Sequence, residues 1–313
     1  MTEEQKKTSG GGLLTLVAIL CTALWGSASP VLKVGYEYFR LDPSDVYSIL
    51  LFAGTRFLGS GFLTMILCRL VTGEKPRFYR GMIGPAITMA LTQTAGQYSL
   101  FYMGLTIVSG TAGALISSTG TFFAVIIAGI IGIEIINGRK IAGILLGMLG
   151  VIVLNLGTDF SLTFRWNGEF FILLSAICYS LANISAKIFG KKHEPIALTS
   201  CQFLIGGTLI SLVGYLGGGR LIWPGFAKSL VLFHLMLVSA VAYGLWNWLL
   251  KRHDVSKVVI FHTLTPVFGA IFSWILLGEN IWRWQTLAAM LLVAFGILLL
   301  NWKSQAKNPT IDS

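Results

Sequence analysis

Long apolar stretches separated by short polar joints recur along the whole chain. Each stretch holds about 20 residues, the length that an α-helix needs to cross the hydrocarbon layer of a bilayer. The joints carry turn-forming residues, as in Asp42-Pro43-Ser44-Asp45 and Gly217-Gly218-Gly219. The pattern therefore predicts an all-α integral membrane protein. It places ten transmembrane helices at 13–33, 47–69, 81–105, 109–134, 139–157, 168–190, 197–217, 229–250, 256–278 and 283–302.

The amino-acid composition excludes an ordinary soluble protein. Charged residues make up 12% of the 313 residues, compared with about 25% in soluble chains, and 55% are hydrophobic. Disorder is excluded too, because a disordered chain has few apolar residues and many charges. The four cysteines lie within apolar stretches and form no CxxC pair, so neither a metal-binding motif nor a disulfide framework is indicated. We expect no cofactor and no metal ion.

Lys and Arg residues gather in alternate joints between the predicted helices. With a cytoplasmic N-terminus, 16 of the 23 basic residues fall on the cytoplasmic side, six fall outside, and Arg56 lies within the second helix. This excess follows the positive-inside rule, so we expect both termini in the cytoplasm and a multi-pass protein of the inner (plasma) membrane. The net charge of +10 then belongs to loops near an anionic lipid leaflet. No basic stripe with interleaved aromatic residues indicates nucleic-acid binding.

The two halves of the chain show an internal repeat. Shifting the second half by 145 residues aligns Tyr98 with Tyr243, and Glu134 with Glu279, without a gap. Single identities between apolar helices are weak evidence. The order and equal spacing of the matches, with five predicted helices in each half, indicate a duplication.

An odd number of helices per repeat determines how the halves are oriented. The predicted repeats, 13–157 and 168–302, each contain five helices, so the second must enter the membrane from the opposite side. Inverted repeats are typical of secondary transporters, which bind substrate near the bilayer midplane between the halves. The sequence has no GxxxxGK motif for ATP. Coupling to an ion gradient such as protons, coupling to substrate exchange, and uncoupled transport all stay open.

Several segments resemble one known family. They are "ALWGSASPVLK", "TRFLGSGFLTMIL", "GIEIINGRKIAGILLGMLGVIVLN", "AICYSLANISAKIF" and "LTPVFGAIFSWILLGENIWRWQTLAAMLLVAFGILLLN". Over 13–302 the chain resembles the ten-helix, EamA-like branch of the drug/metabolite transporter superfamily. The resemblance implies ten helices and secondary transport of a small molecule.

The chain also departs from the family pattern at two places. The family usually has proline in the middle of the fourth helix, where this chain has Gly120-Thr121, whereas the ninth helix keeps Pro266. We therefore expect a softer helix break in the first half. The small multidrug branch relies on a glutamate in the first helix, and none lies between Leu13 and Lys33. This absence counts against cation-for-proton exchange.

Polar and aromatic side chains at membrane depth are the candidates for substrate binding. An apolar cavity with a few orienting hydrogen-bonding groups suits a small organic molecule. The alternative is that the amides and hydroxyls bond neighbouring helices to one another. His262 is either a proton carrier or a packing histidine. The candidates are Trp25, Gln93, Gln97, Tyr98, Tyr102, Tyr179, Asn183, Tyr243, Trp246, Asn247 and His262.

Three charged side chains within the predicted helices form a second group. A charge inside a membrane is costly and is a functional candidate by default. Arg56 either binds a substrate anion or stabilises the helix bundle, and the structural role is favoured. Lys33 and Lys187 lie at matched helix ends, where they either extend to the interface or line a substrate path. This positive-leaning interior favours anionic or zwitterionic substrates.

The function indicated is export of a small metabolite, such as an amino acid, by alternating access around a central cavity. Sugar-phosphate or nucleotide-sugar exchange and multidrug export are alternatives. An enzyme is not expected, because paired carboxylates, HExxH and GxSxG are lacking at membrane depth. A receptor is disfavoured by the short loops. Gly143 and Gly147 permit two helices to approach closely. The two helices belong either to one monomer or to two subunits of a homodimer, and packing within one chain is preferred.

Overall fold

The computed structural model describes residues 3–72, 78–108, 110–154, 156, 165–278 and 284–301, and these are helical with short connections. Glu279, the predicted counterpart of Glu134, lies outside the described residues. The first half contains α1 (Glu3–Tyr38), α2 (Val46–Thr72), α3 (Arg80–Met89), the π-helix η1 (Ala90–Gln97), α4 (Tyr98–Leu105), α5 (Gly110–Ile130) and α6 (Gly138–Leu154). The second half contains α7 (Glu169–Phe189), α8 (Pro195–Leu216), α9 (Phe226–Arg252), α10 (Val255–Val259), the 3₁₀-helix η2 (Ile260–Leu264), α11 (Thr265–Leu277) and α12 (Trp284–Asn301).

Six helical segments within the described ranges are long and apolar enough to cross a bilayer. They correspond to predicted helices one, two, six, seven, eight and nine, and two shorter apolar segments match predicted helices four and ten. The six segments are Gly12–Tyr38, Val46–Leu70, Glu169–Phe189, Pro195–Leu216, Phe226–Arg252 and Val255–Leu277; the shorter two are Ile116–Ile130 and Trp284–Leu300. The expectation of a multi-pass, all-helical membrane protein is confirmed for the described residues.

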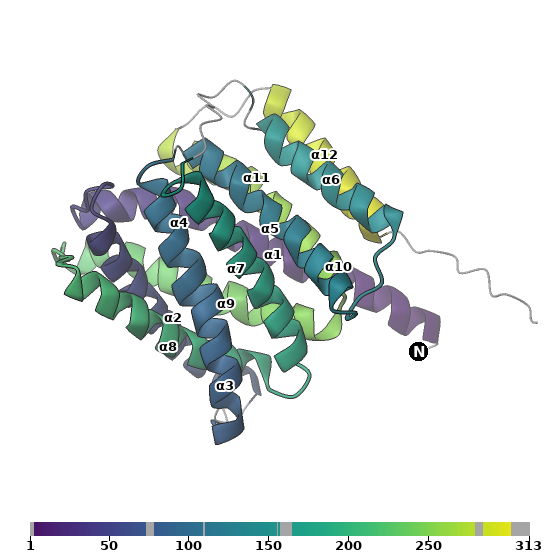
Figure 1. Cartoon of the computed structure of the whole chain (residues 1–313), viewed down its shortest axis with the longest axis horizontal. Coiled ribbons are helices and arrows are strands. Elements are labelled where there is room, and N and C mark those ends of the chain that lie inside the picture. Colours follow the sequence, from purple (N-terminus) through teal and green to yellow (C-terminus); the bar gives the residue numbers. More distant parts are fainter. Residues whose placement is uncertain are drawn as a thin grey trace, which may run out of the picture.

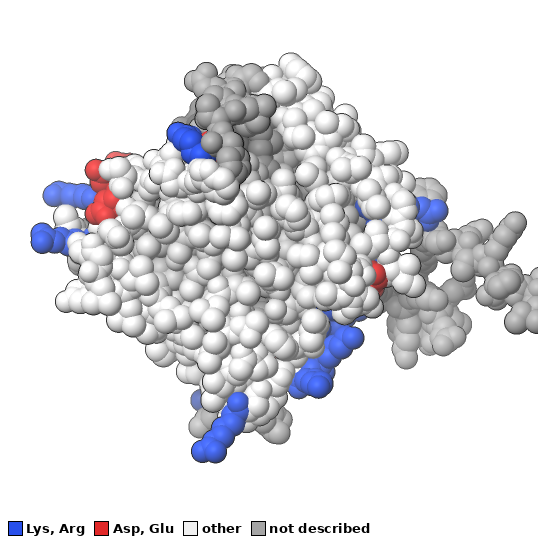
Figure 2. Space-filling model, in the orientation of Figure 1, with Lys and Arg blue, Asp and Glu red and all other residues white. Residues whose placement is uncertain are grey.

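Charged side chains lie mainly at the periphery of the visible face. Figure 2 shows Lys, Arg, Asp and Glu gathered toward its edges, while uncharged atoms cover the area between them. The middle of this face therefore presents few groups that need water. A surface of this kind suits contact with lipid tails.

Two of the predicted membrane helices are interrupted. Predicted helix three consists of α3, η1 and α4, so a π-helical segment lies at its centre. Predicted helix nine consists of α10, η2 and α11. Pro266 has no N–H group to continue the α-helical hydrogen bonds. The Thr265 N–H donates to the carbonyl of His262, three residues earlier, as in a 3₁₀-helix. In contrast, α5 continues through Gly120-Thr121 without a break, in line with the softer break expected there.

Helices from the two halves pack against one another as antiparallel pairs. α2 lies along α8, and α6 lies along α12 (Figure 1). In the second pair, a Cβ atom added to Gly143 would lie 2.8 Å from the Gly296 carbonyl oxygen, and one added to Gly150 would lie 3.0 Å from the Ala289 oxygen. Gly143 thus pairs with Gly296, and Gly150, further along α6, pairs with Ala289, which comes earlier in α12. The two helices are therefore antiparallel.

The glycines of α6 therefore serve packing within one chain. A Cβ atom added to Gly296 would lie 3.0 Å from the Gly147 backbone nitrogen, so the two backbones approach closely. Small residues at such positions allow van der Waals contact between membrane helices. The α6–α12 contact agrees with the preferred prediction from the sequence, in which Gly143 and Gly147 pack within one chain.

Candidate functional site

A cavity of about 330 Å³ lies between helices of both halves, at the break before α11. Its volume falls in the range of about 300–1,000 Å³ that holds small organic ligands. Of the three charged candidates, all of which are described, only Lys33 lines it. The lining residues are Trp25, Gly26, Ser29 and Lys33 of α1; Phe101 of α4; Ser117, Ser118 and Thr121 of α5; Val151 of α6; His262 and Thr263 of η2; and Thr265, Pro266, Gly269 and Ser273 of α11.

An aromatic cluster lies at this cavity, and two of its members, Trp25 and His262, line it. The Trp25 ring lies 5.0 Å from the Tyr243 ring, 4.9 Å from the Trp246 ring and 5.7 Å from the His262 ring, measured between centroids. The ring centroids of Tyr179 and His262 are 4.8 Å apart. α1, α7, α9 and η2 thus bring five of the predicted binding residues together. Edge and tilted ring contacts of this kind stabilise the arrangement and leave Trp25 facing the cavity.

A tyrosine pair joins the two halves beside the aromatic cluster. The hydroxyls of Tyr98 and Tyr243 are hydrogen-bonded to each other, and these residues are equivalent positions of the predicted repeat. The Tyr98 ring also lies 4.6 Å from Phe57 and 5.9 Å from Tyr102. Five predicted aromatic residues are outside the described cavity lining: Tyr98, Tyr102, Tyr179, Tyr243 and Trp246. Tyr179, Tyr243 and Trp246 contact it indirectly, through the rings of Trp25 or His262.

Two predicted amides fix side chains between helices. Asn183 is fully buried, donates from Nδ2 to the Tyr179 carbonyl at 2.7 Å, and accepts from Trp246 Nε1 at 2.7 Å. Asn247 donates from Nδ2 to Thr199 Oγ1 at 2.9 Å. Neither amide lines the cavity. Their contacts fit the alternative interpretation, in which amides bond helices to one another.

The π-helical segment holds the remaining two amides. Gln93 is 1% exposed and accepts from Gln202 Nε2 of α8 at 2.5 Å. Gln97 lies at the end of the segment, and its buried Oε1 has no hydrogen-bond partner in the part of the chain that the structure describes. A π-helix closes its hydrogen bonds between residues i and i+5, and the Gln93–Gln202 bond links this segment to α8. Gln93 therefore belongs to the η1–α8 interface and lies away from the cavity lining.

Arg56 and Lys187 are held by protein groups. Arg56, 2% exposed, donates to Ser239 Oγ from Nε at 3.0 Å and from Nη2 at 2.7 Å. Its guanidinium carbon lies 4.9 Å from the Phe57 ring centroid, a distance that permits cation–π attraction. Lys187 donates from Nζ to the His253 carbonyl at 2.6 Å. Both geometries fit structural roles, at α2–α9 for Arg56 and at the end of α7 for Lys187.

Sequence reasoning missed the hydroxyl groups of the cavity. Ser117 and Ser118 of α5 and Thr265 of α11 line it but were not among the predicted residues. The repeat itself holds a signal, because a shift of 145 residues places Ser117-Ser118 opposite His262-Thr263. Both pairs line the cavity, one from each half.

A buried carboxylate was recognised from sequence only as a marker of the repeat. Glu134 is 8% exposed and follows α5. It accepts hydrogen bonds from Lys140 Nζ at 2.6 Å, from the Ser256 backbone N–H at 3.1 Å and from the Ser256 hydroxyl. These bonds tie the connection after α5 to the start of α6 and to the first turn of α10. Within the described residues, no group of three potential metal ligands is found.

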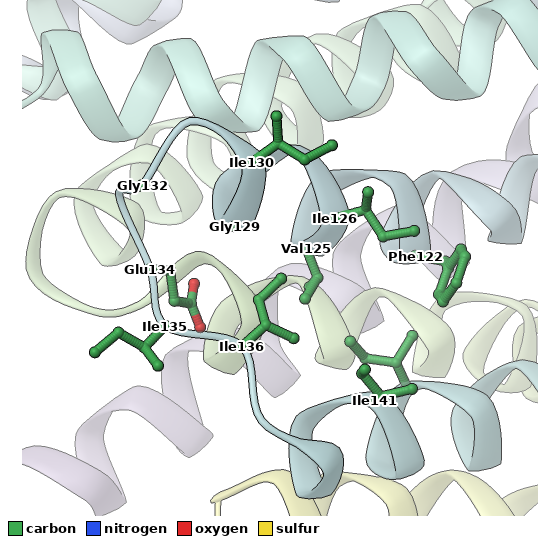
Figure 3. A pocket seen from close by; sticks show the side chains of 11 residues that line it. Phe122, Val125, Ile126, Gly129, Ile130, Gly132, Glu134, Ile135, Ile136 and Ile141 are labelled. Carbon is green, nitrogen blue, oxygen red and sulfur yellow. The ribbon is translucent and has the colours of Figure 1, made fainter.

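A larger groove of about 650 Å³ lies between α5, the connection that follows it and α6 (Figure 3). Isoleucines make up most of its wall, and Ile130 and Ile135 are 79% and 87% exposed. Apolar side chains exposed on a membrane-spanning bundle face lipid rather than water. The smaller cavity, which joins both halves and carries hydroxyls, is therefore the better candidate for a substrate site.

Comparisons with known proteins agree with this architecture. The model of the EamA-like transporter family matches residues 12–156 and 166–302. The "Probable amino-acid metabolite efflux pump" of Escherichia coli (strain K12) is 26% identical, covering 93% of this chain and 97% of that protein. The "Uncharacterized transporter YoaV" of Bacillus subtilis (strain 168) is 25% identical, covering 90% and 94%.

A solved crystal structure extends the agreement to the fold. It superimposes with a TM-score of 0.75 at 18% sequence identity and covers 94% of this chain and 96% of that one. At this identity the likeness concerns the fold alone. The family match covers both halves of the chain, and its two parts meet at the cavity described above. The chain is a multi-pass membrane transporter that belongs to the EamA-like transporter family.

Proposed function

We propose that this protein is a secondary transporter that exports a small organic metabolite, such as an amino acid, by alternating access. The observation that carries the proposal is the cavity of about 330 Å³ between the two halves, lined by Trp25, His262 and hydroxyl side chains. Transporters of repeated architecture bind substrate at the interface between their repeats. The names of the similar efflux pumps support export and an amino-acid-like substrate.

The proposed topology has ten membrane helices in two inverted repeats, 13–157 and 168–302, with both termini on the cytoplasmic side of the inner (plasma) membrane. The antiparallel pairs α2–α8 and α6–α12 support it, because helices two and seven, and helices five and ten, run in opposite directions in this topology. The excess of Lys and Arg in the cytoplasmic joints supports the orientation.

In this topology the cavity occupies the outer half of the protein. It follows α1 from Trp25 outward to Lys33, and α11 from Thr265 outward to Ser273. The opposite end is tied by bonds between connections, including Lys187 Nζ to the His253 carbonyl. The Glu134–Ser256 bonds described above and a Tyr79–His193 hydrogen bond add further ties there. These contacts support an outward-facing state with its cytoplasmic end closed.

Transport by reconstituted protein tests the proposal. We expect proteoliposomes containing the full chain to take up at least one amino acid, and Trp25→Ala to reduce the rate about tenfold by removing ring contacts at the cavity wall. Trp223→Ala is the matched control, because Trp223 is 67% exposed outside the helices and should leave uptake unchanged. Melting temperatures of both variants exclude unfolding as the cause.

Different substrates distinguish the alternatives in the same assay. Uptake of sugar phosphates or lipophilic cations, with none of amino acids, would replace the proposed substrate class. If folded Trp25→Ala and the unmodified protein take up substrate at equal rates, the cavity is not the transport site. A rate that depends on an imposed pH gradient would identify proton coupling.

A further inference from the structure

Several residues that line the cavity carry buried polar atoms with no hydrogen-bond partner in the described part of the chain. Nine buried side-chain nitrogen or oxygen atoms have no hydrogen-bond partner within the described part of the chain, and three of them belong to residues lining this one cavity. They are Trp25 Nε1, Ser117 Oγ and Thr265 Oγ1. Buried polar groups are nearly always paired, so an unpaired cluster calls for a partner from outside the protein.

Neighbouring hydroxyls on the same two predicted membrane helices behave differently. Thr119 Oγ1 donates to the Ile116 carbonyl at 2.6 Å, and Thr263 Oγ1 donates to the Ile260 carbonyl at 2.6 Å. Such bonds within a helix are the usual way for a threonine or serine to satisfy its proton in an apolar setting. Ser117 and Thr265 make no such bond within the described residues, so their hydroxyl protons have no partner there.

The chemistry of these groups selects the ligand atom. An indole N–H only donates, and the two hydroxyls can donate as well. Among the described residues, the cavity lining includes one cation, Lys33, and no acidic residue. Three hydrogen-bond donors in a cavity that a lysine also lines favour an anionic acceptor. We choose a carboxylate over a phosphate because the described lining contains no guanidinium group, the side chain that binds phosphate through two hydrogen bonds at once.

We propose that Trp25 Nε1, Ser117 Oγ and Thr265 Oγ1 form a subsite that binds the carboxylate of the substrate. The three donors come from α1, α5 and α11, so both halves of the chain contribute to it. Lys33 supplies the positive charge that favours the carboxylate within the cavity. This inference rests on the proposed function and assigns the polar end of its substrate.

Ligand-dependent thermal stabilisation of the full chain in detergent tests the subsite. The probes are the common L-amino acids, the α-amide of each one that stabilises the protein, and inorganic phosphate. A ligand that binds the folded protein raises its melting temperature by mass action. We expect at least one amino acid to stabilise, and its amide to bind at least tenfold more weakly, since the amide lacks the charge and one acceptor.

Side-chain variants then assign the donors. Trp25→Phe, Ser117→Ala and Thr265→Val should each weaken binding of the stabilising amino acid about 10-fold or more, which is typical for a hydrogen bond to a charged group. Thr119→Val is the matched control, because its hydroxyl is bonded within α5, and it should leave affinity unchanged. Melting temperatures without ligand confirm that each variant folds.

The outcomes separate the subsite from the proposed function. Equal binding of acid and amide, or unchanged affinity in all three variants, overturns the subsite while export of amino acids stands. Stabilisation by inorganic phosphate equal to that by the amino acid overturns the choice of a carboxylate. If no amino acid is bound or transported, the proposed function fails and the subsite fails with it.

Discussion

At the scale of single residues, Arg56 illustrates how a charge can be buried in a membrane protein. Its guanidinium carries two hydrogen bonds to one acceptor, Ser239 Oγ, and lies against the Phe57 ring. The planar guanidinium makes both bonds at once, which an ammonium cannot do. These contacts join α2 to α9, so Arg56 supports the wall of the bundle.

Arg56→Lys should therefore destabilise the protein. We expect a loss of about 1–3 kcal/mol, because a buried polar partner loses its hydrogen bonds. Thermal unfolding of the purified protein measures it. Arg252→Lys is the control, since Arg252 is exposed over Trp248 at 4.0 Å and should shift the melting temperature little. The double variant Arg56→Lys/Ser239→Ala tests the coupling of the two residues. If its loss of stability equals the sum of the losses in the two single variants, the residues are not coupled.

Sequence reasoning found the aromatic part of the candidate site and missed its hydroxyls for a physical reason. Large aromatic side chains at mid-helix stand out in an apolar sequence, and the fold brings Trp25, Trp246 and His262 together. A threonine in a membrane helix usually bonds its own backbone. Nothing in the sequence distinguishes Thr263, which does so, from Thr265, which does not. Only the packed structure separates them.

At the scale of elements, the backbones of the two halves approach each other closely where α6 meets α12. Gly296→Ala should destabilise the protein by about 1–3 kcal/mol, because its new Cβ would press on the Gly147 nitrogen and push the helices apart. Thermal unfolding checks this expectation. Gly84→Ala in α3 is the control, since a Cβ there has nothing within 4 Å, and we expect no loss of stability. Equal melting temperatures for the two variants would contradict tight α6–α12 packing.

Hydropathy predicted the helices well but could not locate all of their interruptions. The break before α11 has a local cause, since Pro266 lacks an N–H group. The π-helix η1 contains no proline, and it packs closely on α8, where Gln93 meets Gln202. Its irregular turn lies at a contact with a segment that is distant in the sequence. Such contacts cannot be recognised from the composition of 90–97 alone.

At the scale of the whole molecule, the proposed orientation predicts which surface positions face the cell exterior. The four native cysteines are buried or half-buried, so a background with all four replaced by serine is a practical starting point. We expect a membrane-impermeant maleimide to label Trp223→Cys in intact cells and to label Lys191→Cys only after the membrane is opened. The reverse pattern would show that the chain has the opposite orientation.

The way the halves meet has a further consequence. Equivalent elements contact each other: α2 with α8, α6 with α12, and Tyr98 with Tyr243. In an assembly of identical subunits this is the mark of an isologous interface, where one surface patch is complementary to itself. In the proposed inverted topology, each half therefore carries a surface suited to pairing with a second copy inserted in the opposite sense. A gene encoding one half could thus have produced a working dimer before its duplication and fusion.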